Sequence, residues 1–169
     1  MDVLIVRHAI AEERDAQHWP DDRARPLSPE GIARGRKAAS GLKDLTAKPE
    51  LVLASPLRRA QQTAKILERY AHWPRAQVCE ELTPEATPRA LLGRLGRSAG
   101  PCIAVVGHEP QLSALLAQCL PGCAERGFAF RKMGVALVRF RGRVRPGRGQ
   151  LVWFAPPKLL RAAGKARSA

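Results

Sequence analysis

The chain has 169 residues, which is long enough for one domain with a buried core. Its composition, 45% hydrophobic and 26% charged, is that of a globular protein and excludes disorder throughout. No apolar run approaches the roughly 20 residues that cross a bilayer, and no basic region precedes an apolar stretch at the start. The formal net charge of +14 favours anionic ligands or partners, and we expect a cytoplasmic protein without membrane contact.

Strand and helix patterns alternate over the first 120 residues. Short β-branched runs bounded by polar residues indicate buried strands, and a capping residue followed by proline indicates the start of a helix. In chain order we predict a strand at Val3–Val6, a helix at Pro29–Leu42, a strand at Leu51–Ala54, a helix at Leu57–Tyr70, a weak strand at Gln77–Cys79, a helix from Thr87-Pro88 to about Leu95, a strand at Ile103–Val106 and a helix at Pro110–Cys119.

The pattern changes after Gly134, where two apolar runs flank a turn rich in Gly and Arg. Val135–Phe140 and Leu151–Phe154 predict an antiparallel hairpin. The alternation before it favours an α/β fold, a three-layer α/β/α sandwich with a mainly parallel central sheet and a C-terminal antiparallel hairpin. We expect a single domain over residues 1–155 and a frayed basic tail over residues 156–169.

Polar side chains follow three of the predicted strands. Arg7 and His8 come directly after the first strand, and His108 follows the run that ends in Gly107. Ser55-Pro56-Leu57-Arg58-Arg59 follows the strand at Leu51–Ala54. If the three strands are parallel neighbours, their carboxyl ends share the sheet edge at which such folds bind ligands.

This set of side chains suits a phosphoryl group. Guanidinium groups pair with phosphate oxygens through two parallel charge-assisted hydrogen bonds, so Arg7 and Arg59 are the candidate clamps. A neutral imidazole attacks phosphorus, and either His8 or His108 has the right chemistry. We favour His8 because it follows a central strand, where a backbone carbonyl can fix its second nitrogen. His108 then donates hydrogen bonds to the phosphoryl oxygens, near the positive end of the helix that starts at Pro110.

Five segments, in this order along the chain, resemble motifs of the histidine phosphatase superfamily, and most of all its short SixA-type phosphohistidine phosphatases. They are Val6-Arg7-His8-Ala9, Arg25-Pro26-Leu27-Ser28-x-x-Gly31, Ser55-Pro56-x-x-Arg59-Ala60-x-Gln62-Thr63, Glu81-Leu82-Thr83-Pro84 and Val106-Gly107-His108-Glu109-Pro110. The resemblance implies a phosphoglycerate mutase-like fold in which His8 is the phosphorylated nucleophile. It also implies that Arg7 and Arg59 bind phosphate, that His108 completes the pocket, and that no metal or cofactor is needed.

Other positions carry secondary expectations. The wider superfamily usually has Gly where this chain has Ala9, which disfavours a positive φ in the loop after His8. Glu81, or its neighbour Glu80, is a candidate general acid for an alkoxide leaving group, and surface charge is the alternative interpretation. Arg25 and Arg58 are weaker candidates for substrate binding.

The chain has little room for insertions that would cover the pocket, so we expect the pocket to be open to solvent. Because an open pocket admits a protein side chain, we expect the substrate to be a phosphohistidine on a partner protein. One alternative is a small-molecule or sugar-phosphate phosphatase, or a mutase, on the same fold. The other is a non-catalytic basic module with a vestigial His site, which binds nucleic acid or polyphosphate through Arg139, Arg141, Arg143, Arg145 and Arg148.

The positive charge is concentrated at the end of the chain. Residues 126–169 contain twelve Lys or Arg and no acidic residue, so +12 of the +14 lies in that quarter. Such a segment suits an acidic or polyanionic partner, and a solvated arginine-rich edge is the alternative interpretation. The four cysteines, Cys79, Cys102, Cys119 and Cys123, form no Cys-x-x-Cys pair, so we expect buried free thiols and no zinc site or disulfide framework.

Overall fold

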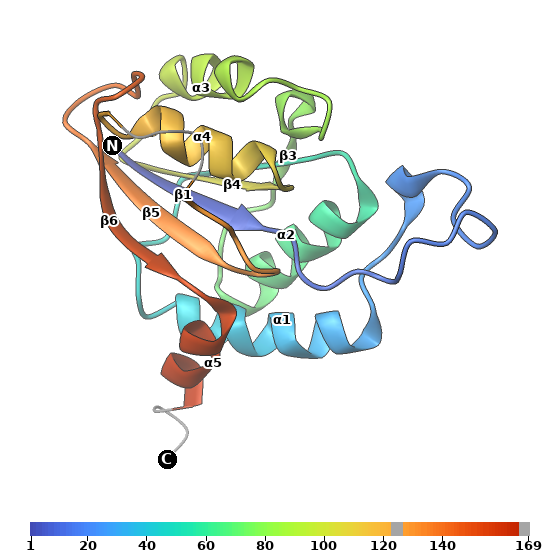
Figure 1. Cartoon of the computed structure of the whole chain (residues 1–169). Coiled ribbons are helices and arrows are strands. Elements are labelled where there is room, and N and C mark those ends of the chain that lie inside the picture. Colours follow the sequence, from blue (N-terminus) through green and yellow to red (C-terminus); the bar gives the residue numbers. More distant parts are fainter. Residues whose placement is uncertain (123–126, 166–169) are drawn as a thin grey trace.

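The computed structural model describes residues 1–122 and 127–165. This part of the chain forms one six-stranded sheet in the order β3-β2-β4-β1-β5-β6 (Figure 1). The strands are β1 (Asp2–Arg7), β2 (Leu51–Ala54), β3 (Gln77–Val78), β4 (Cys102–Gly107), β5 (Val135–Phe140) and β6 (Gly149–Ala155). Strands β3, β2, β4 and β1 are parallel, and β5 and β6 join them as an antiparallel hairpin. The predicted hairpin is therefore confirmed.

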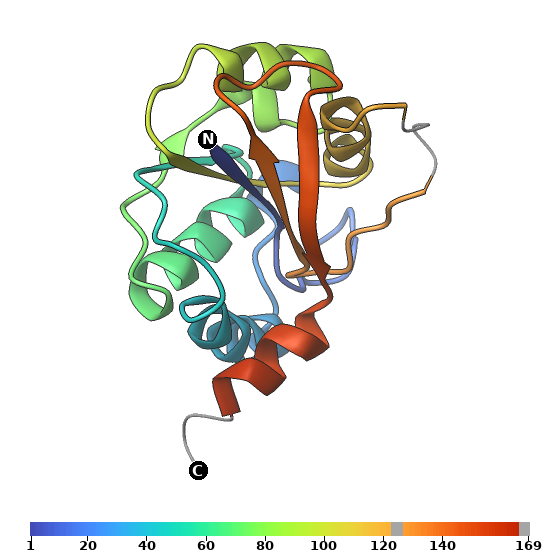
Figure 2. The ribbon, with the colours of Figure 1, turned by 90° about the vertical axis from the view of Figure 1, so that its left-hand side faces the viewer.

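Helices cover both faces of this sheet, which confirms the three-layer α/β/α sandwich (Figures 1 and 2). The helices are α1 (Pro29–Leu42), α2 (Arg58–Tyr70), α3 (Pro88–Gly96), α4 (Gln111–Cys119) and α5 (Pro157–Lys165), with short 3-10 helices η1 (Asp22–Ala24) and η2 (Glu80–Leu82). Helices α1, α2 and α5 lie on one face, and α3 and α4 lie on the other. Side-chain oxygens cap α1 and α3 as predicted: Ser28 accepts from the Gly31 N–H and Thr87 from the Ala90 N–H.

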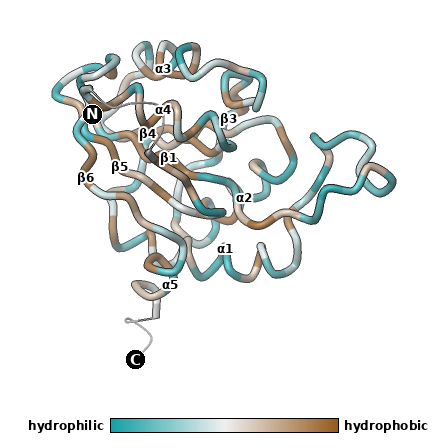
Figure 3. Tube along the Cα trace, in the orientation of Figure 1, coloured by the Kyte–Doolittle hydropathy of each residue, from teal (hydrophilic) through white to brown (hydrophobic). Residues whose placement is uncertain are grey.

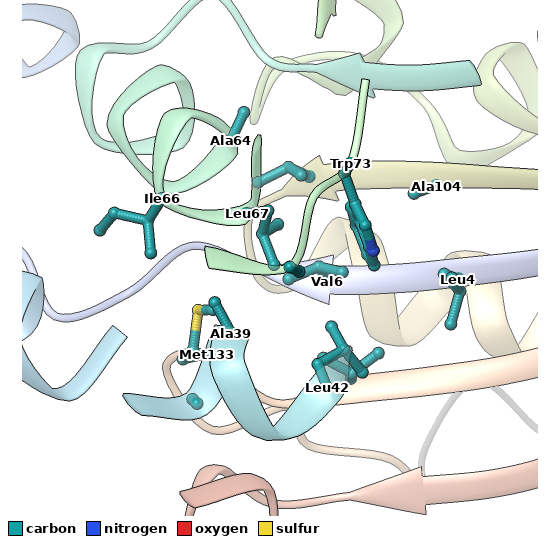
Figure 4. Packing of buried hydrophobic residues seen from close by; sticks show 14 of the residues in the cluster. Leu4, Val6, Ala39, Leu42, Ala64, Ile66, Leu67, Trp73, Ala104 and Met133 are labelled. Atoms are coloured by element: carbon teal, nitrogen blue, oxygen red, sulfur yellow. The ribbon is translucent and has the colours of Figure 1, made fainter. Parts of the chain in front are cut away.

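The alternation of side chains along each strand divides the core into two parts. In β1, Leu4 and Val6 face α1 and α2, whereas Val3 and Ile5 face α3 and α4. Figure 4 shows the first part, in which Leu42 of α1 and Leu67 of α2 pack beside the sheet. The middle parts of the central strands are hydrophobic and the loop before α1 is hydrophilic (Figure 3). Burial on both faces is what holds the strand ends in fixed positions.

The expected frayed tail is wrong over residues 157–165, which form α5, and residues 166–169 lie outside the described part of the chain. This helix packs on α1, and Leu160 is fully buried between them. The two helices approach so closely that a Cβ at Gly41 would lie 1.8 Å from the Leu160 carbonyl oxygen, and one at Gly164 would lie 3.0 Å from the Gly41 nitrogen. Packing of a short helix through its glycines thus overrides the polar composition of the segment.

The described helices include none that is both long and apolar enough to span a membrane. Cys79, Cys102 and Cys119 are buried free thiols, as predicted, and Cys123 lies outside the described residues. Burial raises the pKa of the Cys119 thiol to about 12.

Candidate active site

The condition set by the sequence is met: β2, β4 and β1 are parallel neighbours, so their carboxyl ends meet at one edge. A hollow of about 600 Å³ lies there. It brings together four of the predicted residues and also Arg25. Its lining comprises Arg7, His8, Ile10, Ala11, Glu12, Glu13, Arg14, Arg25, Arg59, Pro84, His108, Glu109 and Lys132.

His8 is held rigidly at the end of β1. Its backbone N–H donates to the Gly107 carbonyl of β4 at 3.1 Å, and its Nδ1–H donates to the carbonyl of Ala9 at 2.7 Å. This second bond places the proton on Nδ1 and leaves the Nε2 lone pair free. Burial, with smaller contributions from the charge of Lys132 and from His108, lowers the pKa of His8 to about 2. The imidazole is therefore neutral, as a nucleophile must be.

His108 lies against His8, with the ring centroids 5.0 Å apart. Its Nε2 pairs with the hydroxyl of Ser55, at the end of β2, over 2.9 Å. Its Nδ1 is buried and has no hydrogen-bond partner among the described residues. Burial and the nearby charge of Arg59 lower the pKa of His108 to about 3. Two neutral rings with unused nitrogen atoms thus border the hollow.

The two candidate clamps reach the hollow from different elements. Arg7 is the last residue of β1, and its guanidinium donates to the carbonyl of Phe130. Arg59, in the first turn of α2, is 4% exposed and donates to the Asp22 carbonyl at 2.7 Å. The Nε atoms of both arginines are buried without a partner in the part of the chain that the structure describes. Each guanidinium is therefore oriented by the protein while part of its donor capacity is unused.

Asp22 of η1 contacts two of the arginines that line the hollow. Its carboxylate lies 3.0 Å from the Arg59 guanidinium and 2.7 Å from Nε of Arg25. Although burial opposes ionisation, the hydrogen bond from Arg25 and the charge of Arg59 hold the pKa of Asp22 below its usual value. Arg25 also donates to the Glu12 carbonyl at 2.6 Å. The predicted Arg25 thus lines the hollow, and it is positioned by Asp22, an acidic residue that the sequence motifs did not indicate.

Lys132 is a lining residue that the sequence prediction missed. The N–H of the next residue, Met133, donates to the carbonyls of Arg7 and His8 at 3.1 Å each, which holds this loop against the end of β1. Burial and then the charges of Arg7, Arg25 and Arg59 lower the pKa of Lys132 to about 8. No local motif marks this lysine, because contacts distant in sequence bring it to the site.

Two predicted residues do not line the hollow. Arg58 is exposed on the surface of α2. The carboxylate of Glu81 accepts a hydrogen bond from the Cys79 thiol at 3.3 Å, and its own backbone N–H together with this bond lowers its pKa. An ionised carboxylate directed at Cys79 is poorly placed to act as an acid.

Two further residues beside His8 and His108 are held by neighbouring elements. Ala9 fits its loop, since His72 and Met133 are the non-glycine residues with positive φ in the described ranges 1–122 and 127–165. Its N–H donates to Thr63 Oγ1 at 3.0 Å. Glu109 turns to the following helix, where its carboxylate accepts a hydrogen bond from the Ser113 hydroxyl at 2.7 Å.

Groups of three or more His, Cys, Asp or Glu that could hold a metal ion are absent from the described residues. The lining of the hollow offers two neutral imidazoles, His8 and His108, and the cations Arg7, Arg25, Arg59 and Lys132. Such a site binds an oxyanion and offers it a nitrogen nucleophile.

Comparison with known proteins agrees with this geometry. The family model "Histidine phosphatase superfamily (branch 1)" matches residues 3–83. The phosphohistidine phosphatase SixA of Escherichia coli is 31% identical over 167 residues, which is 96% of this chain and 98% of the relative.

Solved structures share the whole fold. A structure of the protein histidine phosphatase SixA complexed with tungstate matches with a TM-score of 0.80 at 30% identity, over 95% of this chain and 99% of that one. A mycobacterial glucosyl-3-phosphoglycerate phosphatase matches with a TM-score of 0.66 at 15% identity, over 92% of this chain and 98% of that one, which shows the fold alone. From the identity to SixA over nearly its full length and from the common fold, this chain belongs to the histidine phosphatase superfamily, as a SixA-like phosphatase.

Proposed function

We propose that the protein removes the phosphoryl group from phosphohistidine on a partner protein, through a covalent phospho-His8 intermediate. One observation carries the proposal: the free Nε2 of a buried, neutral His8 borders a hollow lined by Arg7 and Arg59. A relative of the same fold was solved with tungstate, a tetrahedral oxyanion like phosphate.

Binding of the phosphoryl group comes first. Arg7, Arg59, Lys132 and His108 line the hollow. Cations and hydrogen-bond donors in a water-poor site stabilise the charge on the equatorial oxygens as phosphorus is transferred. Because the protein already orients these groups, little reorganisation is required when the anion enters.

Transfer to His8 then follows. The Nε2 lone pair of His8 forms a bond to phosphorus while the P–N bond of the substrate breaks, and that electron pair passes to the departing imidazole nitrogen. The Nδ1–H bond to the Ala9 carbonyl stabilises the positive charge that develops on the His8 ring. In a second step water attacks phosphorus, Nε2 leaves with its electron pair, and orthophosphate is released.

The leaving group favours phosphohistidine over an alkyl phosphate. A phosphoimidazole that is protonated on its second nitrogen leaves as neutral imidazole, so it needs no acid from the enzyme. An alkoxide does need one, and the candidate Glu81 is ionised and bonded to Cys79. The rim also carries the exposed side chains of Glu13 and Arg14, which a protein surface can reach.

The test is a turnover assay with phosphohistidine and p-nitrophenyl phosphate side by side, on the wild type, His8→Ala and His18→Ala. His18 is exposed and does not line the hollow, so it serves as the matched control. We expect His8→Ala to abolish turnover and His18→Ala to retain it. We also expect faster turnover of phosphohistidine than of the aryl ester.

Trapping the intermediate separates this mechanism from others. Brief exposure to labelled phosphohistidine, followed by denaturation, should give a phosphoenzyme that is labile in acid and stable in base. The label should be absent from His8→Ala. A stable serine or cysteine adduct would contradict the mechanism, and preferred turnover of sugar phosphates would contradict the substrate.

A further inference from the structure

A second hollow, of about 710 Å³, lies at the turn between β5 and β6. We call it the arginine basin; it is lined by Arg139, Arg141, Arg143, Arg145, Arg148 and Gln150. Strand β5 runs antiparallel to β1 and pairs Arg139 with Asp2, at the start of β1. The basin therefore lies at the end of the sheet opposite to His8, beside the chain's N-terminus in Figure 1. Five residues of strand, about 17 Å, separate Asp2 from Arg7.

The turn that carries these arginines is anchored to the domain. Val144, in the middle of it, is 3% exposed and packs into the core on the side of α3 and α4. The N–H of Gly147 donates to the Gln118 carbonyl at the end of α4, over 2.9 Å. Gly142 and Gly147 have positive φ, which lets the chain reverse twice. The guanidiniums thus project from a fixed scaffold.

Most of the charge in the basin is uncompensated. Arg139 makes two hydrogen bonds of 2.9 Å to the carboxylate of Asp2. The other four arginines are exposed and have no acidic partner among the described residues. Like charges gathered at one turn repel one another, and an anion of high charge relieves that repulsion.

The side chains of the basin define the kind of anion. All five cations are arginines, whose planar guanidinium pairs with phosphate oxygens through two parallel hydrogen bonds. The lining contains no aromatic or apolar side chain on which a nucleic-acid base could stack. A single phosphate would match one or two of the arginines and leave the rest unpaired. We propose that the basin binds a linear triphosphate, as found in short inorganic polyphosphate and in the phosphate chain of a nucleoside triphosphate.

The test measures binding of inorganic tripolyphosphate by calorimetry to the wild type and to two charge-matched double variants. Arg143→Ser/Arg148→Ser removes two cations from the basin. Arg69→Ser/Arg75→Ser removes two exposed cations near the other edge of the sheet. We expect the first variant to bind about tenfold more weakly or worse, since charge-assisted hydrogen bonds are lost, and the second to bind within twofold of the wild type. Equal weakening of both variants would show general electrostatic attraction and overturn the proposal.

A variant of the hollow at His8 distinguishes anion binding there from anion binding in the arginine basin. Arg59→Ala should lose turnover and keep the tripolyphosphate affinity of the basin, whereas Arg143→Ser/Arg148→Ser should keep turnover. Binding that disappears in Arg59→Ala would assign the anion to the active site and overturn the basin. ATP titrated in parallel identifies the source: tighter binding of ATP than of tripolyphosphate points to nucleotides, and equal or weaker binding points to inorganic polyphosphate. Binding of duplex DNA without binding of tripolyphosphate would also overturn the proposal.

Discussion

Arginines lie at both ends of the central sheet, but buried arginines occur at one end and most of those at the other end are exposed. At the carboxyl end, Arg59 is buried and its guanidinium contacts the carboxylate of Asp22. At the other end, Arg143 and Arg145 project into solvent from a turn. Water and salt screen exposed charges strongly and buried charges much less. The two ends of the sheet therefore differ in the burial of their arginines rather than in the number of cations.

Burial has a second consequence at the carboxyl end. It holds the pKa of His8 near 2 and that of His108 near 3, so both rings stay neutral over the physiological range. The surrounding cations favour the same neutral state by repelling a proton. One arrangement thus supplies both the positive charge and the neutral imidazole that we propose as the nucleophile. The exposed turn at the opposite end has charge but contributes no nucleophile to its lining.

The largest expected difference lies between two arginines adjacent in sequence. Arg59→Ala should lower kcat/KM by about 10² to 10³, the cost of removing one oriented donor to the transferring group. Arg58→Ala should stay within twofold, because Arg58 is exposed on α2 and absent from the hollow. Steady-state kinetics with phosphohistidine would measure both. Equal losses would mean that the contrast between buried and exposed arginines does not govern activity.

The fold and the central residues of the candidate site could be predicted because their signals are local. Buried β-branched runs marked the strands, the cap-and-proline pairs at Ser28 and Thr87 marked helix starts, and His8 and His108 each follow a strand directly. That they meet depends on strand order. The order β2-β4-β1 follows from crossovers, and the sequence indicates these only through the alternation of elements.

Long-range contacts explain what the sequence did not reveal. Lys132 reaches the hollow because the next residue bonds to the end of β1, more than 120 residues earlier in the chain. Helix α5 forms because Gly164 allows it to pack closely against Gly41 of α1. Glu81 occupies the expected segment, yet its side chain turns to Cys79. Spacing in sequence locates a residue near a site but does not determine which way its side chain points.

A smaller effect, with a pH signature, is expected at Lys132. Burial and three arginines lower its pKa to about 8, so its positive charge is present at pH 7 and is lost as the pH rises toward 9. Lys132→Met should lower kcat/KM about tenfold at pH 7, because one charge-assisted hydrogen bond to the anion is removed. In Lys132→Arg, which stays charged, the decline of wild-type activity between pH 7 and 9 should disappear.

Lys65→Met is the control for this pH profile, since Lys65 is exposed on α2. It should reproduce the wild-type profile. His8 and His108 do not titrate in this range, because their pKa values lie near 2 and 3. If Lys132→Arg declined above pH 8 as the wild type does, another group would be responsible and Lys132 would have no role in binding the anion.

The smallest effect is expected at the opposite end of the sheet, where Asp2 pairs with Arg139. The hydrogen bond from Arg139 is the largest cause that holds the pKa of Asp2 below its ordinary value of 3.8. A carboxyl whose pKa is lower in the folded state stabilises the fold above about pH 3.8, and this contribution is lost as the pH falls through the folded pKa. Exposed ion pairs contribute little, so Asp2→Asn should lower Tm at pH 7 by no more than about 2–4 °C.

Thermal unfolding of Asp2→Asn at pH 7 and pH 3, beside the exposed-site control Glu85→Gln, would measure this contribution. The difference from the wild type should shrink at pH 3, because the stabilisation that ionised Asp2 provides declines as the pH falls below about 3.8 toward its folded pKa. A loss much larger than 4 °C would mean that this arginine is as strongly coupled to its acid as Arg59 is to Asp22. The two ends of the sheet would then differ in the depth of the hollow rather than in the strength with which the protein holds its cations.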